Sequence, residues 1–128
     1  MVNLGVKRTK ETPEVHFNYE SGVLSLKGTC ITTEVKEFFE PLIEWLKDYI
    51  GSPADSTEIN FQLEYCNSFS RKYVLEILKM LKDCSEKGNA VSYNWYYAED
   101  DEEVLEEGQT YEQLIEITMN KISIEDYD

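Results

Sequence analysis

The chain has 128 residues, of which 41% are hydrophobic and 12% aromatic, and a formal net charge of −14 at pH 7. This length and composition fit one domain with a substantial core, and they exclude an intrinsically disordered protein. The excess of 26 acidic over 12 basic residues argues against binding to nucleic acids or to anionic membranes, because both need clustered Lys and Arg.

The N-terminal part of the sequence predicts a β-hairpin. Residues 1–11 show no strong pattern and are expected to form a flexible or edge-attached lead-in. Val15, Phe17 and Tyr19 alternate with polar residues, and a second strand-like segment follows at 23–27. The short connection between them predicts antiparallel pairing.

The first helix is predicted by apolar residues at helical spacing over 38–50, after a capping Thr32 or Thr33. Pro41 has no backbone N–H, so it is expected either to kink this helix or to stand in the first turn of a new one. Residues 51–53 are Gly-Ser-Pro, a sequence that ends helices.

A strand-to-helix junction at residues 67–70 is the most informative feature of the chain. Apolar residues alternate over 59–65 and then recur at helical spacing over 74–81. Ser68 and Ser70 lie between them, where the helix begins. The first N–H groups of a helix lack partners, so this end favours anions. A serine here is therefore either an ordinary N-cap or a site where an added phosphate is stabilised.

The C-terminal part predicts two strands that flank a peripheral helix. Residues 90–98 are rich in aromatic side chains and predict a strand. Residues 99–107 are acidic and predict a short helix that ends at Gly108, and 109–114 can add a helical turn. Alternating apolar residues over 115–124 predict the final strand.

The order of these elements predicts a single α/β domain at residues 12–124, followed by a tail at 125–128. Strands separated by helices favour right-handed crossovers and parallel pairing. We therefore expect a mixed, mostly parallel five-stranded sheet with an N-terminal hairpin and packed helices.

Familiar catalytic and cofactor motifs are missing from the sequence. It has no Gly-rich phosphate loop, no Gly-x-Ser-x-Gly and no Cys-x-x-Cys, and His16 is its only histidine, on the outward phase of a strand. The acidic run at 100–103 lacks the spaced oxygen ligands and the glycine of a calcium loop. No cofactor or metal is expected. An enzyme would have to use paired carboxylates such as Glu58 and Glu64.

Three features favour a cytoplasmic protein. No apolar run approaches the roughly 18 residues of a membrane span. The N-terminus has no apolar segment of signal-peptide length. Cys30, Cys66 and Cys84 are odd in number and widely spaced, which argues against a secreted disulfide scaffold.

Residues 63–72 read Leu-Glu-Tyr-Cys-Asn-Ser-Phe-Ser-Arg-Lys and lead into the second apolar helix. This run resembles the central motif of the SiaC family of bacterial regulatory phosphoproteins. In that motif a strand ends in a tyrosine, followed by one residue, Asn, a phosphorylatable Thr or Ser, another residue and Ser. Further matching segments are residues 12–13, 24–28, 39–50 and 88–97, so the resemblance spans nearly the whole predicted domain.

The resemblance implies a STAS-like, non-enzymatic switch similar to the anti-sigma-factor antagonists of partner-switching systems. A cognate protein kinase would phosphorylate the hydroxyl residue of the junction, and a PP2C-type phosphatase would remove the phosphate. In the family's name-giving member, the unmodified form binds and activates a diguanylate cyclase, which raises cyclic di-GMP and promotes biofilm behaviour. Ser68 matches the phosphoacceptor, Asn67 the preceding turn residue and Ser70 the second hydroxyl, whereas Phe69 replaces a small hydroxyl residue.

The residues expected to form the switch surface around Ser68 are Asn67, Phe69, Ser70, Arg71 and Lys72. A phosphate of about −1.5 to −2 charges could accept free N–H groups of the helix and be partly neutralised by Arg71 and Lys72. It would then place bulk and charge in a docking surface without unfolding the domain. The alternative is an acidic interaction module whose binding does not depend on phosphorylation, in which Ser68 is only a cap. The acidity itself serves either solubility or attraction to a basic partner face.

Overall fold

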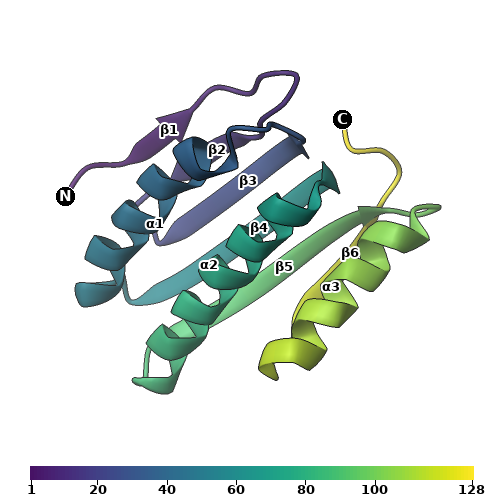
Figure 1. Ribbon diagram of the computed structural model, residues 1–128. Helices are drawn as coiled ribbons and strands as arrows, with labels where there is room; N and C mark the ends of the chain where they lie inside the picture. Colours follow the sequence, from purple (N-terminus) through teal and green to yellow (C-terminus); the bar gives the residue numbers. More distant parts are fainter.

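Three helices cover one face of a six-stranded sheet in the computed structural model, which describes residues 1–128 (Figure 1). The strands are β1 (Leu4–Val6), β2 (Glu14–Phe17), β3 (Val23–Cys30), β4 (Ser56–Cys66), β5 (Ala90–Ala98) and β6 (Asn120–Ile124). The helices are α1 (Val35–Gly51), α2 (Ser68–Glu86) and α3 (Glu102–Ile115). The strands lie in the order β1 to β6 across the sheet, so elements consecutive in sequence are also neighbours in space.

The sheet is antiparallel at its N-terminal edge and parallel elsewhere. β1 pairs with β2 and β2 with β3 in antiparallel register, whereas β3 to β6 pair parallel. Each parallel connection contains one helix, and right-handed crossovers that advance in one direction place all the helices on the same face. Figure 1 shows α2 between α1 and α3 on that face. The predicted α/β class with a mixed, mostly parallel sheet is confirmed.

The predicted count of five strands is wrong, because β1 adds a sixth strand within the expected lead-in. Three residues are too few for an alternating pattern to be recognised in the sequence. Tertiary contacts hold this segment instead: β1 pairs with β2, and the indole N–H of Trp45 donates to the carbonyl of Val2 at 2.7 Å. The lead-in is therefore attached to the edge of the sheet.

Helix α1 runs from Val35 to Gly51 without interruption at Pro41. It does not restart at this proline, which was one of the predicted alternatives. Neither predicted threonine is the N-cap. Glu34 occupies that position without a side-chain capping bond, and the hydroxyl of Thr32 accepts a hydrogen bond from the N–H of Glu34 at 3.0 Å.

The C-terminal third departs most from the expectation. Helix α3 is continuous through Gly108, which was predicted to end a shorter helix. A Cβ atom on Gly108 would lie 2.6 Å from the Cδ1 atom of Trp95, so a glycine is required where the helix packs closely on the sheet. Glu116 ends α3 in the left-handed conformation with a φ of 57°. The predicted final strand at 115–124 is therefore wrong in its first half, since β6 begins at Asn120.

The expected tail at 125–128 is held by several contacts. Tyr127 is buried, and its hydroxyl donates to a carboxylate oxygen of Asp101 at 2.8 Å. Its carbonyl accepts a bond of 2.7 Å from the side-chain amide of Gln62. Asp128 pairs with Arg8 at 2.9 Å. The C-terminus thus packs against the end of the domain at which α3 begins.

The core lies between the sheet and the helices and contains a cluster of 27 buried residues. The opposite face of the sheet carries no helix (Figure 1). On that face Asn94 donates to Asn60 at 2.8 Å and Asn120 donates to Asn94 at 2.9 Å, so polar side chains line the uncovered surface. None of the helices is long and apolar enough to cross a membrane.

Candidate functional site

The predicted site lies where β4 ends and α2 begins, at the carboxyl edge of the parallel strands. Cys66, the last residue of β4, pairs in register with Cys30, the last residue of β3. The backbone N–H of Asn67 donates to the carbonyl of Cys30 at 3.0 Å. The junction is therefore fixed against the end of β3 and close to the loop that leads into α1.

Asn67 is the N-cap of α2. Its backbone is extended, with φ −71° and ψ 168°, and its side-chain Oδ1 accepts a bond of 2.9 Å from the N–H of Ser70. Its side-chain Nδ2 donates to the carbonyl of Thr32 at 3.0 Å. One asparagine thus satisfies a free N–H of the helix and ties the start of α2 to the loop before α1.

Ser68 is the first residue of α2, and its side chain is exposed. Since Asn67 caps the helix, the hydroxyl of Ser68 has no capping role, in contrast to the interpretation of this serine as a simple cap. Helix geometry leaves the N–H groups of Ser68 and Phe69 without intrahelical partners. A nucleophilic hydroxyl is thereby presented to solvent at the positive end of a helix dipole.

Ser70 was predicted to belong to the switch surface, and the structure corrects this. The side chain is fully buried on the core side of α2, and its hydroxyl accepts a bond of 3.1 Å from the thiol of Cys30. The thiol of Cys66 is buried beside it. A hydrogen bond with Cys30 and burial raise the pKa of Cys66, so this thiol stays protonated and unreactive.

Three large apolar side chains that belong to or flank the ends of β3, β4 and the start of α2 are exposed to solvent, and we call them the apolar rim: Ile31, Tyr65 and Phe69. Their exposed fractions are 42%, 50% and 64%. Ile31 follows β3, Tyr65 lies near the end of β4 and Phe69 follows Ser68 in α2. Phe69 also lines a groove at the start of α2, and an exposed apolar side chain at the edge of a groove is typical of a protein-binding surface.

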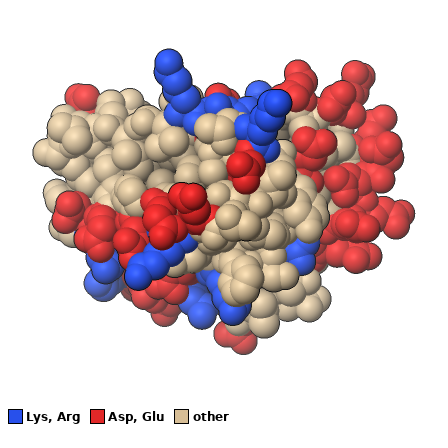
Figure 2. All heavy atoms as spheres, turned by 45° about the horizontal axis from the view of Figure 1, so that its top comes forward, with Lys and Arg blue, Asp and Glu red and all other residues tan.

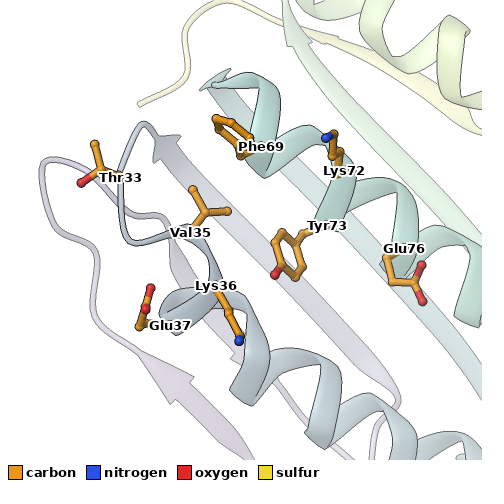
Figure 3. Close-up of a pocket in the computed structure, with 8 residues that line it drawn as sticks. All are labelled: Thr33, Val35, Lys36, Glu37, Phe69, Lys72, Tyr73 and Glu76. Carbon is orange, nitrogen blue, oxygen red and sulfur yellow. The ribbon is translucent and has the colours of Figure 1, made fainter.

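An open groove of about 700 Å³ separates the beginnings of α1 and α2 next to Ser68 (Figure 3). It is lined by Thr33, Val35, Lys36, Glu37, Phe69, Lys72, Tyr73 and Glu76. The ring of Tyr73 stacks on the buried Phe39 with the centroids 4.9 Å apart, which gives the groove a firm wall. The ammonium group of Lys72 lies 5.4 Å from the centre of the Phe69 ring, a cation–π distance.

The opposite side of α2 faces α3 through an ion pair. The Nε atom of Arg71 lies 3.2 Å from a carboxylate oxygen of Glu107, and the hydroxyl of Tyr111 donates to the other oxygen at 3.0 Å. Burial raises the pKa of Glu107, and the contacts with Tyr111 and Arg71 offset part of this effect. The first turn of α2 therefore contacts the groove on one side and α3 on the other.

The negative charge of the molecule is unevenly distributed. Figure 2 shows acidic side chains gathered over one side, which corresponds to the position of α3 in Figure 1. The exposed acidic residues of this segment are Glu99, Asp100, Glu102, Glu103 and Glu106. The first turn of α2, by contrast, contains Arg71 and Lys72 and no acidic residue. A phosphate on Ser68 would meet basic side chains in an otherwise acidic protein.

The carboxylate pair that was considered for an enzyme is not assembled. Glu58 and Glu64 lie six residues apart along β4, which separates them by about 20 Å at strand spacing. The side chain of Glu58 instead accepts a bond of 2.9 Å from Asn60. His16 is exposed on β2, and β3 separates this strand from β4, which leads into the junction. No group of three or more His, Cys, Asp or Glu residues could hold a metal ion.

The sequence interpretation missed residues that reach the site from other elements. Ile31 and Thr32 come from the loop after β3, and Glu107 comes from α3. Parallel pairing of β3 with β4 could have placed Ile31 near the junction. Nothing local indicates Glu107, because its partner lies on another helix.

Comparisons with known proteins agree with this architecture. The model of the SiaC family, described as SiaC family regulatory phosphoprotein, matches residues 6–124. An uncharacterized protein of Pseudomonas aeruginosa (strain UCBPP-PA14) is 28% identical over 106 residues, which cover 83% of this chain and 84% of that protein.

Two solved structures from Pseudomonas aeruginosa share the fold. A chain of the crystal structure of diguanylate cyclase SiaD in complex with its activator SiaC superimposes with a TM-score of 0.88 and 24% identity, covering 94% of this chain and 99% of that chain. Apo-SiaC superimposes with a TM-score of 0.84 and 24% identity, covering 96% and 98%. The family predicted from residues 63–72 is thereby confirmed, and the chain belongs to the SiaC family of regulatory phosphoproteins.

Proposed function

We propose that this protein is a non-enzymatic switch in which Ser68 is the phosphoacceptor. The unmodified surface around Ser68 binds an effector, and phosphorylation of Ser68 releases it. One observation carries the proposal: Ser68 is exposed at the start of α2, has no capping role and directly precedes Phe69, which lines the groove.

The geometry supports a local effect of the phosphate. The group adds about −1.5 to −2 charges and strong acceptor oxygens. The free N–H groups of the first helical turn, together with Arg71 and Lys72, can accommodate it without loss of the fold. Placed next to Phe69 and the groove, the same charge would be desolvated when a partner docks, and an unpaired charge in an interface costs several kcal/mol.

The proposed partners follow from the family. A cognate protein kinase and a PP2C-type phosphatase set the state of Ser68 in the cytoplasm. The effector is a diguanylate cyclase, since SiaC in a structure of the same fold is described as the activator of the cyclase SiaD. The apolar rim and the groove offer this effector apolar contacts, and Lys72 and Glu76 at the groove offer charged ones.

Mass spectrometry tests the assignment of the site. Intact-mass and peptide mapping are carried out on the protein incubated with the candidate kinase, with and without the phosphatase. We expect one phosphate, located on Ser68 and removed by the phosphatase. The Ser68→Ala variant should remain unmodified, whereas Ser70→Ala should be modified normally because Ser70 is buried. Stoichiometric phosphorylation of Ser68→Ala would refute the assignment.

Binding measurements test the switch itself. Ser68→Ala should bind a diguanylate cyclase as the unmodified protein does, under all conditions. The stoichiometrically phosphorylated protein should bind much more weakly, and Ser68→Asp should show only part of this loss because it carries one charge and a smaller group. Equal binding of the phosphorylated and unmodified forms would instead support the phosphorylation-independent interaction module.

A further inference from the structure

The Arg71–Glu107 pair is the only ion pair in the structure that joins two helices. The side chain of Glu107 is only 13% exposed, whereas that of Arg71 is 47% exposed. Glu107 has one further partner, the neutral hydroxyl of Tyr111. If Arg71 moved away, a largely desolvated carboxylate would keep a single hydrogen bond, which is unfavourable for its ionised form.

Ser68 lies on the exposed side of α2 between Arg71, which faces α3, and Lys72, which lines the groove and is about 40° away around the helix axis. At about 100° per residue, Ser68 and Arg71 are about 60° apart around the helix axis and one turn apart along it. Phe69 and Tyr73 point to the other side, where they line the groove next to α1 (Figure 3). The regular first turn, in which the N–H of Arg71 donates to the carbonyl of Asn67 at 3.1 Å, keeps this arrangement in place.

A phosphate on Ser68 would compete with Glu107 for the guanidinium group. The phosphate carries more charge than a carboxylate and can accept two parallel bonds from an arginine. It also lies nearer to solvent, so the side chain of Arg71 can reach it without burying further charge. Lys72 is less suited to this role, because its ammonium group is a single point charge that lies over the Phe69 ring.

We propose that phosphorylation of Ser68 draws Arg71 from Glu107 to the phosphate and thereby changes the packing of α3 against α2. This inference rests on the proposed function and extends it, because the phosphorylation state is then transmitted to α3 and its acidic surface. Effectors that contact α3 can distinguish the two states even when they do not touch Ser68.

The proposal can be tested on Glu107, whose titratable and charged neighbours are Arg71 of α2, Tyr111 of α3, Asp101 before α3 and Cys66 of β4, with Glu103 and Glu106 lining the same surface pocket. Phosphoserine is installed at position 68 by genetic code expansion, so that no kinase is needed. The pKa of the Glu107 carboxyl is followed by NMR, and hydrogen exchange is measured over Glu102–Ile115. Parent protein, Arg71→Ala and Arg71→Gln are compared, with Lys72→Ala as the matched control.

In the parent and in Lys72→Ala, the phosphate should raise the pKa of Glu107 and accelerate amide exchange in α3 several-fold. In both Arg71 variants these changes should already be present without the phosphate, and the phosphate should add little. The proposal would be overturned if the phosphate left the pKa of Glu107 and the amide exchange of α3 unchanged in the parent protein. It would also be overturned if the Arg71 variants responded to the phosphate as the parent does. Failure of the proposed function is seen separately, as a missing phosphate after kinase treatment or as unchanged effector binding.

Discussion

The backbone N–H of Ser70 donates to the side-chain Oδ1 of Asn67 at 2.9 Å, and this bond makes Asn67, not Ser68, the N-cap of α2. The Nδ2 atom of Asn67 also donates a hydrogen bond to the carbonyl of Thr32 at 3.0 Å. Because the helix is already capped, the hydroxyl of Ser68 is not needed for stability. The residue next to the cap can therefore be modified without loss of the helix start.

Replacement of Asn67 by alanine should destabilise the protein by about 1–2 kcal/mol, since it removes the cap and leaves the carbonyl of Thr32 without its partner. Ser68→Ala is the matched control and should change the free energy of unfolding by less than about 0.5 kcal/mol. Urea denaturation followed by circular dichroism measures both values. A loss in Ser68→Ala as large as that in Asn67→Ala would show that Ser68 helps to cap the helix after all.

A second prediction concerns the contact between α3 and the sheet at Gly108. A Cβ atom here would lie 2.6 to 2.9 Å from atoms of the Trp95 indole, which is buried and cannot withdraw. Gly108→Ala should therefore destabilise the protein by about 1–3 kcal/mol through overpacking. Gly51→Ala, at the end of α1, is the control because nothing lies within 4 Å of the added methyl group. It should be neutral or stabilising, and similar losses in both variants would contradict the packing argument.

Elements with a clear local pattern were predicted well. Residues 90–98 were expected to form a strand, and β5 has the same bounds (Ala90–Ala98). The junction at 67–70 was also placed correctly, because the change from a period of two to a helical period can be read from the sequence. The family resemblance then indicated which serine of the junction to consider.

Features that depend on contacts distant in sequence were not predicted. Gly108 suggested the end of a helix, yet its role is to admit Trp95 from β5. Ser70 was predicted to belong to the switch surface around Ser68, but helical geometry turns its side chain toward Cys30 and the core. The pairing of Arg71 with Glu107 joins residues on two helices, and no local pattern in the sequence specifies it.

A third prediction concerns the first residues of the chain. Deletion of residues 1–6 removes β1 and the carbonyl of Val2, which accepts a bond of 2.7 Å from the indole of Trp45. Loss of this one bond should cost about 0.5–1.5 kcal/mol, and loss of the strand should add to it. In NMR spectra the indole N–H of Trp45 should shift markedly. The indole of Trp95, which donates to Val104 at 2.7 Å, is the internal control and should not shift. An unchanged Trp45 signal would mean that residues 1–6 are a dispensable lead-in.

The fourth prediction follows from the buried carboxylate of Glu107 in the unmodified protein. Burial raises its pKa above the ordinary value of 4.5, and the contacts with Tyr111 and Arg71 offset only part of this rise. The folded state therefore binds the proton more tightly than the unfolded state does. The stability that this group contributes is complete below its unfolded pKa and is lost as the pH rises through its folded pKa.

The free energy of unfolding of the parent protein minus that of Glu107→Gln should accordingly decrease as the pH rises from about 4 toward neutrality. Urea denaturation at a series of pH values measures this difference, in which the other titrating groups largely cancel. Glu102→Gln, at an exposed position of the same helix that does not line the pocket beside Arg71, controls for the exchange of a carboxylate for an amide. A difference that increased with pH would mean that the attraction of Arg71 outweighs burial at Glu107. The pKa of Glu107 would then lie below its ordinary value, and the ion pair between α2 and α3 would stabilise the fold more strongly than its burial opposes it.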